Sequence, residues 1–316
     1  MITDDKTALS ATPAGSDSRR PGISAFFPAY NDAGTIASMV LAALHTCARL
    51  TDDYEVIVIN DGSSDYTGEV LAEMESKYER VRVITHPKNR GYGGALKTGF
   101  NAATKELVFY TDGDAQYDAH ELALLMAALR PDVDIVQGYK IERQDPIFRI
   151  IIGRTYHWIV KLAFGLHLRD TDCDFRLIRK SALNRFDLKS DTGTMPLELV
   201  KRLQESGAVF AEVPVHHYHR AYGRSQFFNF PRLWATGVNL LKLWVELVLR
   251  PRMTGRKPVK RVKPPMKVDP RNPTLLRHPG PVSIEQLEAM GGGPYSGPLP
   301  QDAQPSAPGS QERIHP

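Results

Sequence analysis

Two carboxylates separated by a single glycine, Asp112 and Asp114, follow the apolar segment at residues 107–111. The side-chain amide of Gln116 comes two residues later. Oxygen ligands of this kind suit a divalent cation such as Mg²⁺, which keeps few protein ligands and takes the others from water and substrate phosphates. A short acidic motif by itself is more often a solvated turn, so its interpretation depends on its neighbours.

Two earlier apolar segments, residues 23–30 and 54–60, also end in polar side chains. The first leads into Asp32 and the second into Asp61. Helical patterns separate these segments, which calls for right-handed crossovers and a mainly parallel sheet. Parallel strands bring their carboxyl ends to one edge, so the three acidic ends are predicted to share a crevice. With a divalent cation present, such a crevice suits a nucleotide diphosphate.

The elements that must position these groups alternate along the first half of the chain and predict an α/β fold. Further strands are expected at residues 81–85 and 133–138, and the glycine run 91–94 precedes a helix. The second half predicts helices at residues 148–166, 194–204 and 227–249, with an extended segment at 209–218.

Length and composition fit one large domain or two small ones, because the chain has 316 residues with an ordinary globular composition. We expect a disordered arm at residues 1–21, a catalytic domain at 22–250, and a basic linker with a Pro/Gly-rich tail at 251–316. The two cysteines form no framework. With neither a signal peptide nor a long apolar run, the protein is expected on the cytoplasmic side.

Two other interpretations compete for parts of the chain. The run Gly91-Tyr92-Gly93-Gly94 suggests a dinucleotide fold, but Leu96 stands where a third glycine is needed, and a tight turn before a helix explains the glycines. His217 and His219 share a face of an extended segment and could chelate a metal, although a surface or acceptor-site role is favoured. Basic and aromatic residues near Arg220 lack the wider basic face of a nucleic-acid site, so no nucleic-acid partner is expected.

The order and spacing of the motifs resemble a GT-A glycosyltransferase of family 2. The motifs are FPAYND at 27–32, NDGSSD at 60–65, NRGYG at 89–93 and DGDAQ at 112–116. Later elements, DTDCDFR at 170–176, EVPV at 212–215, Arg220 and GRS at 223–225, resemble the polyprenyl-phosphate (dolichyl-phosphate) mannose and glucose synthases within that family. The resemblance covers about residues 23–249 and implies a mainly parallel, Rossmann-like sheet flanked by helices.

This resemblance implies roles for individual residues. The donor, a UDP- or GDP-linked hexose, would be held by Pro28, Ala29, Tyr30, Asp32, Asp61, Asn89, Gly91, Asp112 and Gly113. Mg²⁺ or Mn²⁺ would be bound by Asp112, Asp114 and Gln116. The phosphate of a polyprenyl-phosphate acceptor would be gripped by Lys140, Arg154 and Arg220. The chain departs from the family pattern at Lys140, where arginine is usual, and at Asp174, where glycine is usual.

The chemistry depends on the acceptor. A lipid phosphate is already ionised near neutral pH, because its second pKa is about 6, and needs only cationic positioning. An alcohol must lose a proton to a carboxylate, for which Asp172 and Asp174 are candidates. Alternatively, a salt bridge from Asp170 to Arg176 simply fixes this loop. A single displacement, with Asp114, Arg154, Asp172 and Arg220 as the candidate catalytic residues, would invert the anomeric centre.

Two amphipathic helices bear on location. The helix ending at Leu249 has a wide apolar arc and is followed at once by Arg250, Arg252 and further basic residues. This pattern is typical of a segment drawn to anionic lipid headgroups, so we expect peripheral attachment to the inner face of the membrane. Transfer to a hydroxyl acceptor and a non-catalytic nucleotide- or lipid-binding module remain the alternatives.

Overall fold

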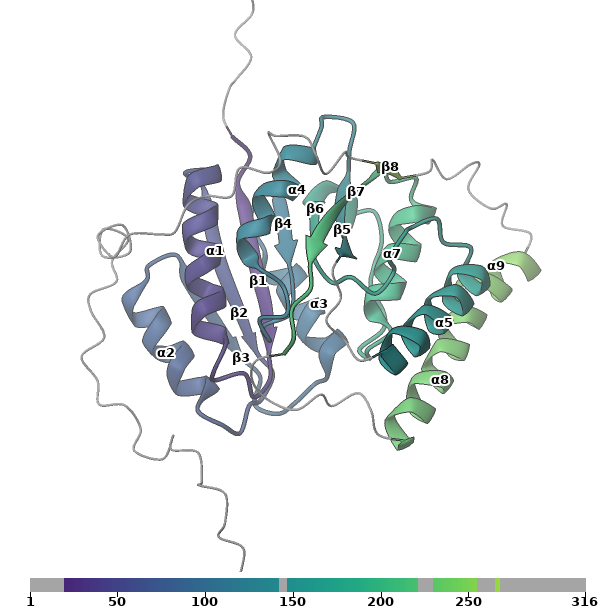
Figure 1. Cartoon of the computed structure of the whole chain (residues 1–316), viewed down its shortest axis with the longest axis horizontal. Coiled ribbons are helices and arrows are strands. Elements are labelled where there is room, and N and C mark those ends of the chain that lie inside the picture. The colour runs from purple at the N-terminus through teal and green to yellow at the C-terminus, as the bar shows by residue number, and fades with distance from the viewer. Residues whose placement is uncertain (1–19, 142–146, 221–229, 255–264, 268–316) are drawn as a thin grey trace, which may run out of the picture.

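The computed structural model describes residues 20–141, 147–220, 230–254 and 265–267 of the chain (Figure 1). Its centre is an eight-stranded sheet with the strand order β3-β2-β1-β4-β6-β5-β7-β8. The strands are β1 (Ile23–Ala29), β2 (Tyr54–Asn60), β3 (Val81–Thr85), β4 (Leu107–Tyr110), β5 (Ile135–Ile141), β6 (Arg176–Arg179), β7 (Phe210–His216) and β8 (Met266–Lys267). Only β6 runs antiparallel to its neighbours within this sheet, so the predicted α/β class with a mainly parallel sheet is confirmed.

Helices pack on both faces of the sheet (Figure 1). Side chains of α1 (Ile36–Leu50), α2 (Thr67–Lys77) and α4 (Leu122–Ala128) contribute to one buried cluster. The other cluster is built by α3 (Tyr92–Ala102), α5 (Ile147–Phe164), α6 (Lys180–Leu183), α7 (Met195–Glu205) and α8 (Phe230–Trp244). The 3₁₀ turn Ala119–Glu121 precedes α4, and the π-helical turn Val245–Leu249 joins α8 to α9 (Arg250–Met253).

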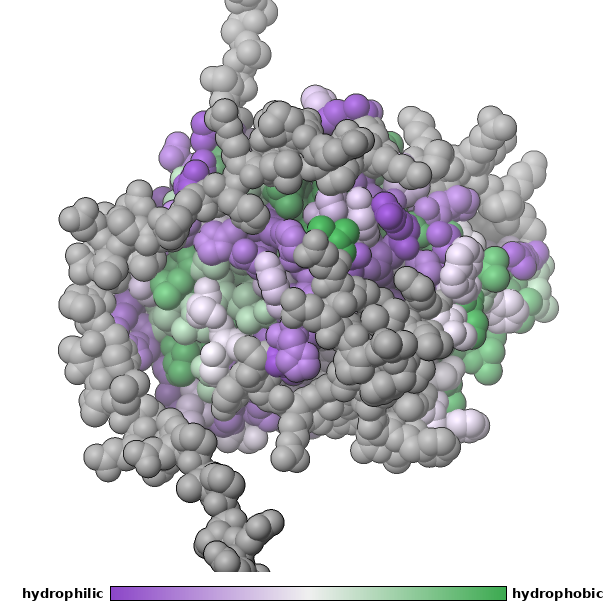
Figure 2. All heavy atoms as spheres, in the orientation of Figure 1, coloured by the Kyte–Doolittle hydropathy of each residue, from purple (hydrophilic) through white to green (hydrophobic). Residues whose placement is uncertain are grey.

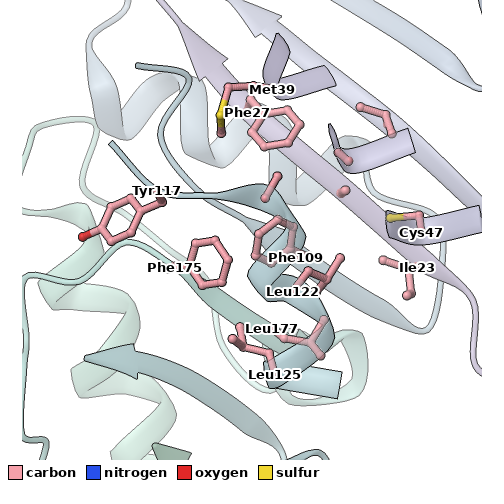
Figure 3. Close-up of a cluster of buried hydrophobic side chains, with 14 of the residues drawn as sticks. Ile23, Phe27, Met39, Cys47, Phe109, Tyr117, Leu122, Leu125, Phe175 and Leu177 are labelled. Atoms are coloured by element: carbon pink, nitrogen blue, oxygen red, sulfur yellow. The ribbon is translucent and has the colours of Figure 1, made fainter. Parts of the chain in front are cut away.

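A column of aromatic rings holds the middle of the sheet together (Figure 3). Phe109 on β4 lies edge-on to Phe27 of β1 at 6.5 Å and to Phe175 before β6 at 4.9 Å, measured between ring centroids. All three side chains are fully buried. Strands covered on both faces become almost continuously apolar, which is why every residue of β1 is buried. This packing fixes the strand ends on which the polar residues stand.

Several elements differ from what the sequence predicts. Strand β6 carried no prediction, because the loop considered in the sequence ends at Arg176, and it pairs antiparallel with β4 and β5. Helix α4 carried no prediction. Strand β8 pairs with β7 inside the segment for which the sequence predicts a linker, whereas most of both predicted terminal segments lies outside the described residues. None of the helices in the described ranges is long and apolar enough to cross a membrane.

Candidate active site

The loops that follow β1, β2 and β4 interlock at one edge of the sheet. The hydroxyl of Thr35 donates to the Gly113 carbonyl at 3.0 Å, tying the β1 loop to the acidic motif. The side-chain oxygen of Asn31 accepts a hydrogen bond from the Ser64 amide at 2.9 Å, tying the same loop to the end of β2. The structure therefore brings the three predicted acidic strand ends together.

Gly113 lies so close to β1 that no side chain fits. A Cβ atom there would approach the Pro28 carbonyl oxygen to 2.8 Å and Cδ1 of Ile36 to 3.1 Å. Ala29 is buried at the end of β1, whereas Tyr30 is exposed. The backbone of β1 thus fixes the position of the acidic motif relative to the sheet.

Asp112 is held by a tyrosine from a different loop. The hydroxyl of Tyr92, at the start of α3, lies 2.5 Å from Oδ1 of Asp112 and 3.1 Å from Oδ2 of Asp174. The pKa of Asp112 is raised well above its usual value by burial, and then by the neighbouring charges of Asp174 and Asp114. A site of this kind disfavours another negative charge and favours a cation.

Asp114 is paired with a cation from the other end of the domain. The carboxylate of Asp114 accepts a hydrogen bond from Arg220. Its Oδ1 atom also accepts one from the backbone amide of Gln116 at 3.1 Å. The side-chain amide of Gln116 donates to the Tyr218 carbonyl at 3.2 Å, and the Tyr218 amide donates back to the Gln116 carbonyl at 2.8 Å. The segment after β7 is therefore docked on the acidic motif.

Asp32 adds a third buried acid to this edge. Burial raises its pKa to about 6, the Tyr30 amide opposes that rise by donating at 3.0 Å, and the charge of Asp114 adds to it. Among the described residues, no three His, Cys, Asp or Glu side chains could hold a metal ion by themselves. Asp112 and Asp114 still fit a divalent ion, because such an ion takes its remaining ligands from phosphate and water. The guanidinium of Arg220 already supplies positive charge at this position.

Asp61 lies at the end of β2, beside the loop before α3. Its Oδ1 accepts the Arg90 amide at 2.8 Å and lies 2.6 Å from Nδ1 of His86. Asn89 is exposed, and its side chain accepts the Gly91 amide at 2.9 Å. Gly91 has a φ of 83°, which favours glycine, so the glycine run forms the tight turn predicted for it.

The predicted acceptor residues Lys140 and Arg220 have separate partners. Lys140, near the end of β5, donates from Nζ to the Asp172 carbonyl at 2.8 Å. Burial raises the pKa of Asp172 to about 6, against the opposing charge of Lys140. Arg220 instead contacts Asp114, and Arg154 lies on α5 with a side chain outside the described set.

Below the loop at residues 170–176 lies a buried hydrogen-bond network that the sequence does not predict. Arg176 is fully buried and pairs with Asp174, not with Asp170 as the sequence suggested. It also bonds to the Tyr110 hydroxyl and donates from Nε to Oε1 of Gln137 at 3.0 Å. Asp174 thereby joins the loop to Tyr92 and Asp112. The only sequence feature that hinted at this network is Tyr92, a large residue within the glycine run before a helix.

His216, the last residue of β7, and His217 have partners of their own. Nδ1 of His216 lies 2.5 Å from Oε1 of Glu121, an acid that is close in space although it is 95 residues away in sequence. The ring of His217 packs edge-on against Tyr117 at 5.1 Å between centroids, and His219 is exposed. The part of the chain described by the structure holds no metal-ligand group there.

Comparison with known proteins defines the class of protein. Residues 24–187 match the model of glycosyl transferase family 2. The chain belongs to this family and has the GT-A fold. The family resemblance seen in the motifs is therefore confirmed.

The individual relatives share less than a third of their residues with this chain. The chain is similar to glycosyltransferase AglD of Haloferax volcanii, with 29% identity over 261 residues that cover 80% of this chain and 41% of that protein. It thus spans less than half the length of this relative. In fold it is similar to glucosyl-3-phosphoglycerate synthase of Mycobacterium tuberculosis, crystallised with Mn²⁺, UDP and phosphoglyceric acid, at a TM-score of 0.55, with 16% identity over 72% of this chain and 78% of that one. A crystal of the same synthase with Mg²⁺ and UDP gives a TM-score of 0.53, with 16% identity over 72% of this chain and 79% of that one.

Proposed function

We propose that the chain transfers a hexose from a nucleotide-diphosphate sugar to a polyprenyl phosphate, assisted by Mg²⁺ or Mn²⁺. The observation that carries this proposal is the contact between Asp114 and Arg220. It puts a carboxylate suited to a metal–diphosphate directly beside a guanidinium suited to a second phosphate. Donor and acceptor phosphates would then meet at one edge of the sheet.

On this proposal the donor lies in the crevice after β1, β2 and β4. Asp112, Asp114 and Gln116 would hold the metal, which would act as a Lewis acid toward the diphosphate leaving group. Gly113 lets the backbone of the acidic motif pack directly against β1. The nucleoside and sugar are held by Pro28, Ala29, Tyr30, Asp32, Asp61, Asn89 and Gly91. The crystals of similar fold that contain UDP with Mn²⁺ or Mg²⁺ support this arrangement.

The acceptor phosphate is positioned by Lys140, Arg154 and Arg220. Arginine forks bind phosphate oxygens in pairs, and lysine adds a point charge. Because the phosphate is ionised near neutral pH, these residues need to orient it rather than remove a proton. Its oxygen then attacks the anomeric carbon opposite the leaving diphosphate, which inverts that centre.

A lipid acceptor also requires approach to a membrane, and we propose that α5, α8 and α9 make it. Large apolar side chains are exposed on these helices: Trp158, Ile159, Leu162, Trp234, Leu241 and Met253. Apolar residues gather at the edge of the molecule formed by α8 and α9 (Figure 2). Arg250 and Arg252 are exposed beside them, and further basic residues follow in the sequence. Exposed apolar residues with adjacent cations fit an anionic lipid surface.

The test is incubation with UDP-glucose, UDP-N-acetylhexosamine or GDP-mannose, together with undecaprenyl phosphate and Mg²⁺. Formation of a lipid-linked sugar, released by mild acid, is the expected result. Sugar transfer to alcohols with none to the lipid phosphate would overturn the choice of acceptor.

One observation favours a second candidate, transfer to a hydroxyl group. Asp172 has a pKa raised to about 6 and lies beside Lys140, as a general base for an alcohol would. One of the two similar crystal structures contains phosphoglyceric acid, which carries a hydroxyl group next to its phosphate. The same incubation with phosphorylated hydroxy acids in place of the lipid separates the two candidates.

A further inference from the structure

A buried histidine stands behind Asp61, outside the residues assigned so far to donor binding. His86 follows β3 directly and its backbone amide donates to the Asn60 carbonyl at 2.9 Å, so its position is fixed by the sheet. The exposed fraction is 6% for His86 and 2% for Asp61. Their Nδ1 and Oδ1 atoms are 2.6 Å apart. Burial makes this contact strong, because little water competes for either group.

The other side of the ring is satisfied in either protonation state. Nε2 of His86 lies 3.0 Å from the Thr98 hydroxyl, which is itself 3.0 Å from the Gly94 carbonyl. A neutral ring accepts the hydroxyl hydrogen at Nε2, and a charged ring donates to the hydroxyl, which then turns to Gly94. In both states Nδ1 carries a hydrogen and donates it to Asp61.

One oxygen of Asp61 is consequently saturated. Oδ1 accepts from Nδ1 of His86 and from the Arg90 amide at 2.8 Å. Within the described ranges the structure gives Oδ2 no hydrogen-bond partner. The carboxylate is therefore held in one orientation, with Oδ2 as the oxygen left to accept a hydrogen bond from a ligand.

We propose that His86 is a positioning residue that sets the nucleobase preference of the donor site through Asp61. This inference rests on the proposed function, in which Asp61 contacts the nucleoside. An oriented carboxylate oxygen accepts a hydrogen bond from an imide-type N–H, which uracil and guanine present. Cytosine and adenine present an unprotonated ring nitrogen at the equivalent position. This nitrogen and Oδ2 of Asp61 are both acceptors, so they cannot form a hydrogen bond with each other. A buried site that leaves polar groups unpaired rejects the wrong ligand.

The test compares the affinities of four Mg²⁺-loaded nucleoside diphosphates, measured by calorimetry: UDP, GDP, CDP and ADP. Wild-type protein is expected to bind UDP or GDP at least tenfold more tightly than CDP and ADP. His86→Leu is expected to weaken the preferred nucleotide by about tenfold or more, the usual size of a hydrogen bond to a charged group, and to bring the ratio to CDP and ADP close to one. At saturating donor, kcat is expected to stay within about twofold, so the change falls on the donor KM.

Two further variants separate positioning from a structural role. His86→Asn keeps an N–H donor near Oδ1 of Asp61 and is expected to restore most of the discrimination. His45→Leu removes an equally buried histidine from α1 and is expected to leave the nucleotide ratios unchanged. A His86→Leu protein that weakens all four nucleotides equally, or keeps the wild-type ratios, would overturn the inference. Wild-type protein that binds none of the four nucleotides would overturn the proposed function and the inference with it.

Discussion

The guanidinium of Arg220 is paired with the carboxylate of Asp114 across 106 positions of sequence. On the proposed function, a metal bound by Asp114 would compete with Arg220 for the same carboxylate. Metal binding would then displace Arg220 and leave its guanidinium free for an acceptor phosphate. The pair predicts an order of events in which the metal–nucleotide complex binds first and prepares the acceptor site.

Removing Arg220 is expected to strengthen the binding of the metal ion and to weaken the binding of the acceptor. Arg220→Ala removes the competitor at Asp114, so Mn²⁺ is expected to bind several-fold more tightly, while the acceptor KM rises by tenfold or more. Titration of Mn²⁺ by electron paramagnetic resonance gives the first quantity and initial rates give the second. Weaker Mn²⁺ binding in this variant would contradict the competition.

Replacing Asp114 is expected to abolish turnover. Asp114→Asn keeps the size of the side chain but loses the charge that would hold the metal, so kcat should fall by at least 100-fold and metal-dependent nucleotide binding should be lost. Asp132→Asn, at an exposed carboxylate, serves as the control and should be fully active. An active Asp114→Asn protein would remove the basis for the metal assignment.

Asp172 gives a pH test of the two candidate acceptors. With a pKa of about 6, it would act as a base only above that pH, and a lipid phosphate also loses its second proton near pH 6. Asp172→Asn should keep the acidic limb of the rate profile if the acceptor is a phosphate. If the acceptor is an alcohol, the variant should lose 100-fold or more in kcat.

The same residue predicts a change in stability with pH. The folded-state pKa of Asp172 is raised from 3.8 to about 6, so its contribution favours folding at low pH and is lost as pH rises through about 6. Asp172→Asn should therefore gain stability relative to wild type between pH 4 and pH 7. Urea unfolding at both pH values measures the difference, and an equal difference at the two would contradict the raised pKa.

The buried pair of Asp174 and Arg176 is expected to be coupled. Asp174→Ala leaves the fully buried guanidinium without its counter-charge and should cost about 3 kcal/mol of unfolding free energy. In Asp174→Ala with Arg176→Met the charge is gone altogether, so the double variant should be less destabilised than the sum of the single variants. Additive costs in urea unfolding would show that the pair is not coupled.

The exposed tryptophans are expected to control membrane binding without affecting the site. Trp158→Ser with Trp234→Ser should reduce co-sedimentation with vesicles rich in phosphatidylglycerol by fivefold or more at low salt. Activity on a short-chain, water-soluble polyprenyl phosphate should be unchanged, because neither residue has a role in the crevice. Wild-type protein that ignores such vesicles would exclude the proposed attachment.

The sequence predicts those features of the fold and the site that depend on a local pattern of residues. An apolar strand ending in Asp112 and Asp114 predicts both a buried strand and an acidic edge, and the parallel connections predict that Asp32 and Asp61 share that edge. The structure has this geometry because the right-handed crossover leaves few other topologies. The roles of these residues remain predictions.

The sequence could not reveal contacts between distant segments. Nothing local to Arg176 shows that it is buried among Tyr110, Gln137 and Asp174, since arginine is seldom fully buried. His86 likewise has no neighbour in sequence that predicts Asp61 as its partner. Strand β6 was missed because four residues between loops carry too little alternation to identify a strand.

The antiparallel strand β6 also constrains how the chain can be made. It is paired with β4 on one side and β5 on the other, yet it follows both in the sequence. While the chain is being synthesised, β1 to β4 can assemble, but the far edge of β4 has no partner until Arg179 has left the ribosome. An open strand edge invites pairing with other chains. Nascent chains halted before this strand should therefore aggregate, whereas those that extend past it should be protected.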